Sequence, residues 1–226
     1  MVGQHKVAIG EGHLSMKTLL IMAHMDDESL SCGGLIRNRI RDGGQVFTAV
    51  CFGRSYDYSR ESHDAREYSD FTKALEELGA PKHSTAKHTE GEPGRVGYYA
   101  LLEYVEYVLK EQAPDEVVIP GKFDLNQDHR HLHDVCRIAL RPCNLGQVRR
   151  ILAARAFDSE LREPSWFETM SGDVLSKKLG AINCYEAESR VFPHPRSPEN
   201  VRAYHQVMGS KCGHRYAEVY DLILQR

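Results

Sequence analysis

Short apolar runs alternate with longer amphipathic segments over the first two thirds of the chain. Residues 18–23, 46–52 and 116–120 are short runs that are almost entirely apolar. Such runs are typical of strands buried on both faces of a parallel sheet. A further strand is expected over residues 149–157.

The segments between these runs have apolar residues at helical spacing. One predicted helix covers residues 29–42 and ends at Gly43-Gly44, and another covers residues 59–78 and ends at Gly79. Strands that alternate with helices predict βαβ units, and therefore an α/β protein with a parallel sheet. The polar, glycine-containing residues 83–97 predict a loop. Further helices are expected over residues 99–111, 129–140, 174–188 and 199–208.

The composition is that of a folded protein with one sizeable core. The chain has 226 residues, 41% of them hydrophobic and 27% charged. Its formal net charge of -3 argues against a general nucleic-acid-binding protein, because such proteins usually carry an excess of basic residues. The sequence has no apolar run of the roughly 18 residues that a membrane span requires. Residues 1–15 are weakly patterned and lack the apolar run of a secretory signal, so we expect a cytoplasmic protein.

The cysteines also favour a reducing compartment. None of the six belongs to a C-x-x-C pair, and they are scattered among apparent core elements, so a disulfide framework is not indicated. They are Cys32, Cys51, Cys136, Cys143, Cys184 and Cys212.

Two polar clusters follow predicted strands closely. The segment 24–28 (HMDDE) comes after residues 18–23, and the segment 124–129 (DLNQDH) follows residues 116–120. Ligands of open parallel sheets bind beyond the carboxyl ends of the strands. Three adjacent carboxylates repel one another, and a divalent cation would remove that repulsion. Imidazole and carboxylate ligands suit a zinc ion that activates a water, with a spare carboxylate as the base.

Each cluster has a plainer interpretation when it is taken alone. Acidic residues at the start of a helix interact favourably with the helix dipole, and an aspartate at a helix start is commonly a cap. Two such clusters, each at the end of a strand, favour the metal site. The pair Gly33-Gly34 lacks the G-x-G-x-x-G spacing, so a dinucleotide site is not indicated.

At these residues the sequence resembles a known family. AHMDDE, from Ala23 to Glu28, is similar to the AHPDDE signature of the PIG-L/LmbE-type zinc-dependent N-deacetylases, and DLNQDHR, from Asp124 to Arg130, is similar to their second motif, commonly H-P-D-H. The resemblance covers most of residues 17–226. It implies a Rossmann-like three-layer α/β fold with a mostly parallel central sheet. It also implies one deacetylase domain over residues 16–226, preceded by a flexible extension of residues 1–15.

The resemblance further implies a role for each motif residue. His24, Asp27 and His129 would bind Zn²⁺, or another divalent metal such as Fe²⁺. Asp26 would be the general base that deprotonates the metal-activated water. The implied reaction removes an acetyl group from an amino-sugar-containing substrate, such as a small N-acetylated glycoside or a nucleotide sugar. The oligomeric state stays open, a homo-oligomer included.

Two positions depart from the usual motifs of the family. Met25 stands where proline is usual, which changes the rigidity of the loop but not a ligand. Asn126 stands where many members have the first histidine of H-P-D-H. We assign Asn126 a catalytic role because its amide can donate a hydrogen bond to an oxyanion, although it cannot shuttle a proton. The plainer alternative is that Asn126 caps the helix that follows.

The acid that protonates the leaving amine is left open by this substitution. Asp26 could return the proton that it removes from the water. The histidines His131, His133 and His194 are other candidates, although an ordinary surface or packing role is the commoner one for each.

Candidate substrate-binding residues are arginines near the expected crevice. Arg54 follows the predicted strand 46–52, Arg66 lies in the next predicted helix, and Arg196 lies in a proline-rich loop. They could hold sugar hydroxyls or a phosphate. Solvated or ion-paired surface arginines are the plainer interpretation.

Two other classes of function compete with the deacetylase. One is a non-catalytic Rossmann-like module that binds a metal or a nucleotide sugar, which Asn126 supports best. The other is a metal-dependent phosphoesterase, which is disfavoured because a two-metal site would need more carboxylate ligands than these clusters supply. Metal content, acetate release and phosphate release discriminate among the three.

Overall fold

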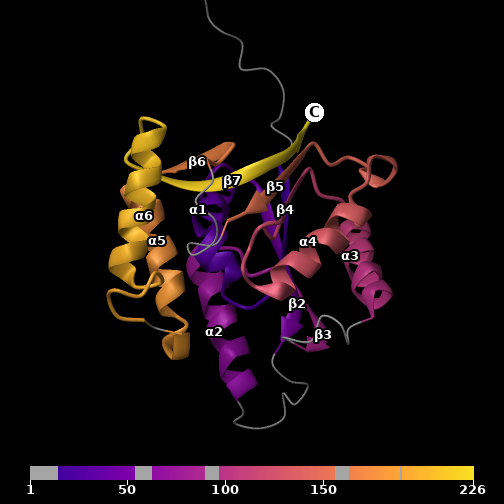
Figure 1. Cartoon of the computed structure of the whole chain (residues 1–226), viewed down its shortest axis with the longest axis horizontal. Coiled ribbons are helices and arrows are strands. Elements are labelled where there is room, and N and C mark those ends of the chain that lie inside the picture. The colour runs from indigo at the N-terminus through magenta and orange to yellow at the C-terminus, as the bar shows by residue number, and fades with distance from the viewer. Residues whose placement is uncertain (1–14, 54–62, 90–96, 156–162, 189) are drawn as a thin grey trace, which may run out of the picture.

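The structure is a computed structural model that describes residues 15–53, 63–89, 97–155, 163–188 and 190–226. The seven strands of these residues form one sheet, in the order β3-β2-β1-β4-β5-β7-β6 (Figure 1). The strands are β1 (Lys17–Met22), β2 (Gln45–Gly53), β3 (His83–Thr89), β4 (Glu116–Ile119), β5 (Arg150–Ala154), β6 (Trp166–Met170) and β7 (Tyr216–Gln225). The helices are α1 (Asp27–Arg41), α2 (His63–Leu78), α3 (Tyr98–Gln112), α4 (Gln127–Ala139), α5 (Gly172–Asn183) and α6 (Pro198–Lys211), with short 3-10 helices at Pro142–Asn144 and Glu186–Glu188.

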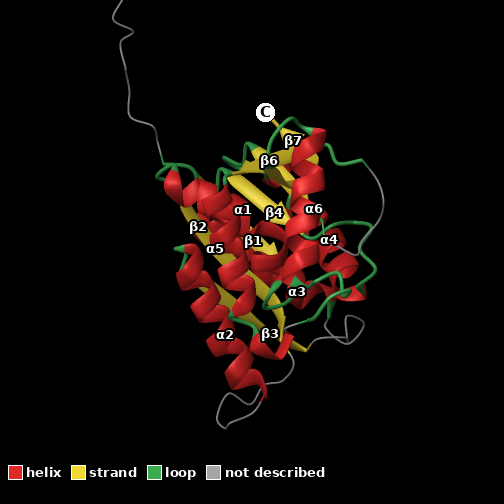
Figure 2. Cartoon of the chain, turned by 90° about the vertical axis from the view of Figure 1, so that its left-hand side faces the viewer, coloured by secondary structure: helices red, strands yellow, loops and turns green. Residues whose placement is uncertain are grey.

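The helices form a layer on each face of the sheet. Helices α3 and α4 cover one face, and α1, α2 and α5 cover the other, with α6 beside α5 over β7 (Figure 1). Figure 2 looks onto the side of α5 and α6, with the strands behind the helices. The expected three-layer α/β fold with a mostly parallel sheet is therefore confirmed.

The central strands divide their apolar side chains between the two layers. Along β1, Leu19 and Ile21 pack against the α3 and α4 side, whereas Leu20 and Met22 pack against the side of α1 and α2. All four are almost fully buried. A strand covered on both faces has no polar face, which is why its sequence is a continuous apolar run.

The order of the strands determines where a ligand can bind. Strands β3, β2, β1, β4 and β5 are parallel to one another, and β1 lies next to both β2 and β4. The chain first moves outward from β1 to β2 and β3, and then returns to β4 on the other side of β1. The connections that leave β1 and β4 therefore diverge, and they leave a crevice at the carboxyl ends of these two strands.

The elements expected up to residue 140 are confirmed, with ends that differ by a few residues, except for the loop expected over residues 83–97. Residues 59–62 of the expected helix 59–78 lie outside the described residues. The expected loop 83–97 contains strand β3, which the pattern missed because only Ala86 among its described side chains is buried. Among the described strands, β3 lies at the edge of the sheet and pairs with β2 alone. The expected helix 174–188 ends at Asn183.

The two antiparallel strands, β6 and β7, were not expected. Each carries a buried charged residue, Glu168 and Glu218, in place of an apolar one. Buried charges interrupt the apolar pattern by which strands are recognised. The extension expected over residues 1–15 lies outside the described residues except for Ser15. Among the described residues, no helix combines the length and apolarity needed to cross a membrane; the cytoplasmic location stays a prediction from the sequence.

Helix α1 is held at its middle by side chains from other elements. The Glu218 carboxylate of β7 accepts hydrogen bonds from the N–H groups of Gly34 and Leu35, at 2.6 and 2.7 Å. In a regular helix, these N–H groups donate to the carbonyls of Leu30 and Ser31, four residues earlier. The carboxylate thus binds directly to the backbone of one helical turn.

The two carbonyls of that turn have side-chain partners as well. The Lys178 ammonium of α5 donates to Leu30 O at 2.7 Å, and the Tyr220 hydroxyl of β7 donates to Ser31 O at 3.0 Å. Lys178 also lies 2.5 Å from Glu218, and both side chains are almost completely buried. Either charge would be costly to bury without its partner. The pair therefore fixes α1 against β7 and α5.

We predict that Gly34→Ala destabilises the protein, because Glu218 and Met170 occupy the space beside this residue. A Cβ at position 34 would lie 2.2 Å from the Met170 sulfur and 2.9 Å from Glu218 Cδ. Overpacking of this kind costs about 1–3 kcal/mol, and each kcal/mol lowers the melting temperature by roughly 2–4 °C at this chain length. Gly172→Ala is the control, because a Cβ there meets nothing within 4 Å. Equal melting temperatures for the two variants would contradict the prediction.

Candidate active site

The crevice between β1 and β4 brings together the two polar clusters of the sequence. His24 follows β1, Asp27 is the first residue of α1, and His129 lies in the first turn of α4. One nitrogen or oxygen atom of each lies within 4.8 Å of the others. This is the residue set that the resemblance implied as metal ligands, drawn from segments more than 100 positions apart.

The spacing of these atoms fits a tetrahedral metal site. His24 Nδ1 lies 3.2 Å from His129 Nε2, Asp27 Oδ2 lies 3.3 Å from His129 Nε2, and Asp27 Oδ2 lies 3.8 Å from His24 Nδ1. Ligands about 2.0–2.1 Å from a tetrahedral zinc ion are about 3.3–3.4 Å from one another. The three side chains therefore suit one divalent cation without a large rearrangement.

Both histidines are oriented by a carboxylate on the side away from this centre. Asp124 Oδ2 lies 2.8 Å from His129 Nδ1, and Asp128 Oδ2 lies 3.1 Å from His24 Nε2. Metal-binding histidines usually have such a partner, because it fixes the tautomer and the orientation of the ring. The donor set thus includes the outer carboxylates that support metal ligands.

The charges of Asp27 and His129 are coupled. Burial raises the pKa of Asp27, but His129 and His24 outweigh this effect and hold the pKa well below its usual range. Burial lowers the pKa of His129, but Asp27 and Asp124 outweigh it and hold the pKa well above its usual value of 6.5. Without a cation, the cluster is therefore a buried ion pair in which His129 carries the positive charge.

Asp26 lies beside this cluster, at the start of α1, in a different environment. Burial, reinforced by the charge of Asp27, raises the pKa of Asp26 to about 8. Arg196 opposes this shift, and its guanidinium donates to Asp26 Oδ2 at 3.2 Å. A cation bound next to Asp26 would also lower its pKa. Asp26 is thus a carboxyl group poised to exchange a proton near neutral pH.

Glu28, the third acidic residue of the motif, is completely buried. Its Oε1 accepts hydrogen bonds from the Tyr185 hydroxyl at 2.7 Å and from Ser29 Oγ at 2.6 Å. Its Oε2 accepts one from the Asp26 N–H at 3.1 Å. Burial raises the pKa of Glu28, and these three donors favour its charged form. Glu28 is therefore hydrogen-bonded to Tyr185, Ser29 and the Asp26 backbone, and it does not belong to the cluster of His24, Asp27 and His129.

Asn126 is the N-cap of α4. Its side-chain oxygen accepts a hydrogen bond from the Asp128 N–H at 2.8 Å, and its own N–H donates to Asp124 Oδ1 at 2.8 Å. The capping alternative is therefore present in the structure. A catalytic role for its amide nitrogen stays a prediction.

The three candidate arginines have different outcomes. Arg196 contacts Asp26 and is partly buried. Arg66 is exposed on α2, and no described contact joins it to the cluster. Arg54 lies outside the described residues.

Three residues that support the site, Asp124, Asp128 and Tyr185, had no role predicted from the sequence. Asp124 and Asp128 lie in a segment that the sequence singled out, so their spacing around His129 was a usable signal. Tyr185 is 157 positions from Glu28, and no local pattern connects the two. Such a contact is visible only in the fold.

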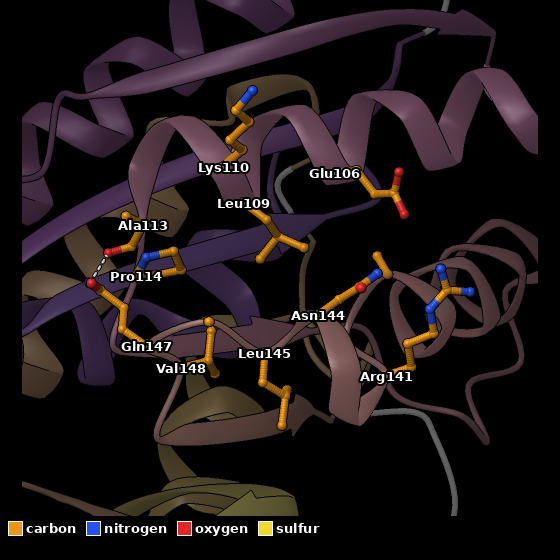
Figure 3. A pocket seen from close by; sticks show the side chains of 12 residues that line it. Glu106, Leu109, Lys110, Ala113, Pro114, Arg141, Asn144, Leu145, Gln147 and Val148 are labelled. Atoms are coloured by element: carbon orange, nitrogen blue, oxygen red, sulfur yellow. Dashed lines mark hydrogen bonds between the residues drawn. The ribbon is translucent and has the colours of Figure 1, made fainter.

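Two cavities differ in their relation to the cluster. A small one of about 30 Å³ adjoins Asp26 and is lined by Leu30, Ile182, Tyr185 and Arg196, among others. A larger cavity of about 640 Å³ lies at the end of the sheet where β4 and β5 begin, away from the crevice. It is bounded by the end of α3 and residues 141–148 (Figure 3). Gln147 donates a hydrogen bond to the Ala113 carbonyl beside it (Figure 3). The larger cavity contains none of the three candidate ligands, so we place the chemistry at the crevice.

Together, the fold and the site define an α/β protein in which His24, Asp27 and His129 converge at the switch point of the sheet. The family GlcNAc-PI de-N-acetylase (PIG-L) matches residues 19–140, more than half of the chain. The chain belongs to the PIG-L family. Comparison with curated proteins gave no match.

Solved structures share the fold at low sequence identity. The N,N'-diacetylchitobiose deacetylase from Pyrococcus horikoshii is 19% identical, with a TM-score of 0.72 over 92% of this chain and 84% of that one. The zinc-inhibited form of the teicoplanin deacetylase Orf2 is 16% identical, with a TM-score of 0.70 over 93% and 99%. GalB, the 4-carboxy-2-hydroxymuconate hydratase from Pseudomonas putida KT2440, is 17% identical, with a TM-score of 0.71 over 93% and 97%. Because a hydratase has this fold too, the fold alone does not determine the reaction.

We predict that metal binding at the cluster releases protons. His129 is charged in the metal-free protein, and only a neutral imidazole can bind a metal. The affinity for Zn²⁺ should therefore fall as the pH is lowered, and it should still rise as the pH increases above 6.5, because the pKa of His129 lies well above that value. Calorimetric titrations in buffers of different ionisation enthalpy measure the protons released. A binding enthalpy that is the same in all buffers would contradict the prediction.

We predict that Asn126→Ala lowers the free energy of unfolding by about 1 kcal/mol, because α4 loses its cap. Asn126→Ser is the matched control, since serine is a good cap but lacks the amide donor. If Asn126 only caps the helix, the serine variant regains both stability and turnover. If the amide stabilises an oxyanion, the serine variant regains stability alone. Thermal unfolding and turnover, measured on both variants, separate the two roles.

Proposed function

We propose that the protein is a metal-dependent amide hydrolase that removes an N-acetyl group from a substrate containing an amino sugar. The convergence of His24, Asp27 and His129 beside Asp26 is the observation that carries this proposal. Membership of a family described as a de-N-acetylase, and deacetylases among the proteins that share the fold, support it.

His24, Asp27 and His129 would hold the metal, for which Zn²⁺ and Fe²⁺ are the candidates. When bound, a divalent cation polarises the acyl carbonyl and lowers the pKa of a water to about 7. The outer carboxylates, Asp124 and Asp128, keep the two imidazoles turned toward the centre.

Asp26 would act as the general base. It accepts a proton from the attacking water as the water oxygen bonds to the acyl carbon. The carbon–nitrogen bond then breaks, and the proton passes from Asp26 to the amine nitrogen. The products are acetate and a free amine. In this scheme one carboxyl group acts first as base and then as acid. The histidine that many members of the family have at the position of Asn126 is therefore not required.

The described residues do not favour a phosphoesterase with two metals. The described part of the chain offers one group of three or more histidine, cysteine or acidic side chains close enough to share an ion. Two-metal sites place two ions about 3.5–4 Å apart and need further ligands.

Acetate release is the direct test of the proposed function. The protein loaded with Zn²⁺ or Fe²⁺ is incubated with N-acetylated sugars, glycosides and nucleotide sugars, and acetate, free amine and phosphate are measured. We expect equal amounts of acetate and amine from at least one substrate and no phosphate. A metal-loaded protein that releases no acetate from any of them would support the binding module instead.

The adjacent aspartates should respond differently to substitution. Asp26→Asn should keep the metal and lose turnover by a factor of about 10²–10⁴, the usual effect of removing a general base. Asp27→Asn should lower the metal content, because it removes the carboxylate ligand. Metal analysis and turnover of both variants check the assignment. Loss of the metal in Asp26→Asn, with retention in Asp27→Asn, would reverse the two roles.

A further inference from the structure

The backbone of Asp26 has a conformation that needs support from its surroundings. Its φ is 137° and its ψ is -25°, in a region that residues with side chains rarely adopt. Such a conformation is strained and persists only where neighbouring groups enforce it.

Hydrogen bonds on both sides of the residue provide this support. The Asp26 N–H donates to Glu28 Oε2 at 3.1 Å. The Asp26 carbonyl accepts from the N–H groups of Ser29 and Leu30 at 3.1 and 2.9 Å. With the peptide groups on both sides held, the direction of the Cα–Cβ bond is set, and with it the place of the carboxylate.

The carbonyl side of this arrangement is ordinary for the start of a helix, but the N–H side is not. The hydrogen bond of the Asp26 N–H depends on Glu28, whose carboxylate is held in turn by the Tyr185 hydroxyl at 2.7 Å. Tyr185 follows α5 and is almost completely buried, so its hydroxyl has little freedom to move. A chain of contacts thus runs from Tyr185 through Glu28 to the backbone of Asp26.

We propose that Tyr185 and Glu28 are positioning residues for Asp26. The Tyr185 hydroxyl holds the Glu28 carboxylate, Glu28 holds the Asp26 N–H, and the Asp26 carboxylate is thereby aimed at the reacting water. The effect on turnover rests on the proposed function, whereas the positioning of the Asp26 backbone does not.

The test compares Tyr185→Phe with Tyr104→Phe. Each substitution removes one hydroxyl that has a hydrogen-bond partner at 2.7 Å. Tyr185 is buried and Tyr104 is half-buried, but Tyr104 contacts Ser84 on the other side of the sheet. We expect Tyr185→Phe to lower kcat about tenfold, in the range typical of groups that orient metal-site residues, with KM and metal content unchanged. Tyr104→Phe should leave kcat within twofold of the wild type. Equal kcat in the two variants would overturn the proposal.

Glu28→Gln gives a second variant of the same chain of contacts. The amide keeps the shape of the side chain, but only one of its two end groups can accept a hydrogen bond. Its kcat should fall as well, and adding Tyr185→Phe should cause little further loss, because both changes break one chain of contacts. Multiplicative losses in the double variant would show that the two residues act independently and would overturn the proposal.

Amide hydrogen exchange at Asp26, followed by NMR, tests the positioning without any activity. In Tyr185→Phe the Asp26 amide should exchange at least tenfold faster, while the Leu35 amide of the same helix is unchanged. Unchanged exchange at Asp26 would overturn the proposal, and so would faster exchange with an unchanged kcat. If the wild type releases no acetate, the proposed function fails, and the exchange rates alone decide whether Tyr185 positions Asp26.

Discussion

The buried ion pair between Lys178 and Glu218 is the contact on which the site depends most. It binds α1 through its backbone, at the carbonyl of Leu30 and the N–H groups of Gly34 and Leu35, rather than through side chains that could adjust. The acidic motif lies at the amino end of the same helix, so the distance from α1 to β4 decides whether Asp27 can meet His129. Gly34 permits the close approach of α1 to β6 and β7, because Met170 and Glu218 occupy the space where a Cβ would lie.

The three consecutive carboxyl groups of Asp26, Asp27 and Glu28 have different contacts, and these contacts shift their pKa values differently. Asp27 faces two imidazoles and stays charged, Asp26 faces one guanidinium in a buried place and has a raised pKa, and Glu28 turns inward to hydroxyl and amide donors. Groups with the same chemistry can act as ligand, acid-base group and support only if their environments push their pKa values apart. The change of backbone direction at Asp26 makes this possible, because it sends neighbouring side chains to separate surroundings.

The sequence predicted the part of the fold and site that depends on local pattern. Apolar runs revealed the central strands, and the rule that the carboxyl ends of parallel strands meet at one edge of the sheet predicted that His24 and His129 lie close together. Strand β3 was missed because an edge strand needs few buried side chains, and β7 was missed because Glu218 occupies a position that the pattern reserves for an apolar residue. Tyr185 could not be predicted, since its contact with Glu28 arises only when α5 packs on α1. The roles predicted for His24, Asp27 and His129 come from the resemblance to the family, whereas the distances between their side chains come from the structure.

The place of β7 in the sheet links the start of the chain to its last described strand. Glu218 is 184 positions from the helix that it holds, and β7 also separates β5 from β6. During synthesis a chain emerges from the ribosome amino end first. Helix α1 and the residues that follow β1 are therefore made long before their anchor exists. A nascent chain can form the parallel strands β1 to β5 early, but the residues at the start of α1 acquire their final arrangement only after β7 has been translated.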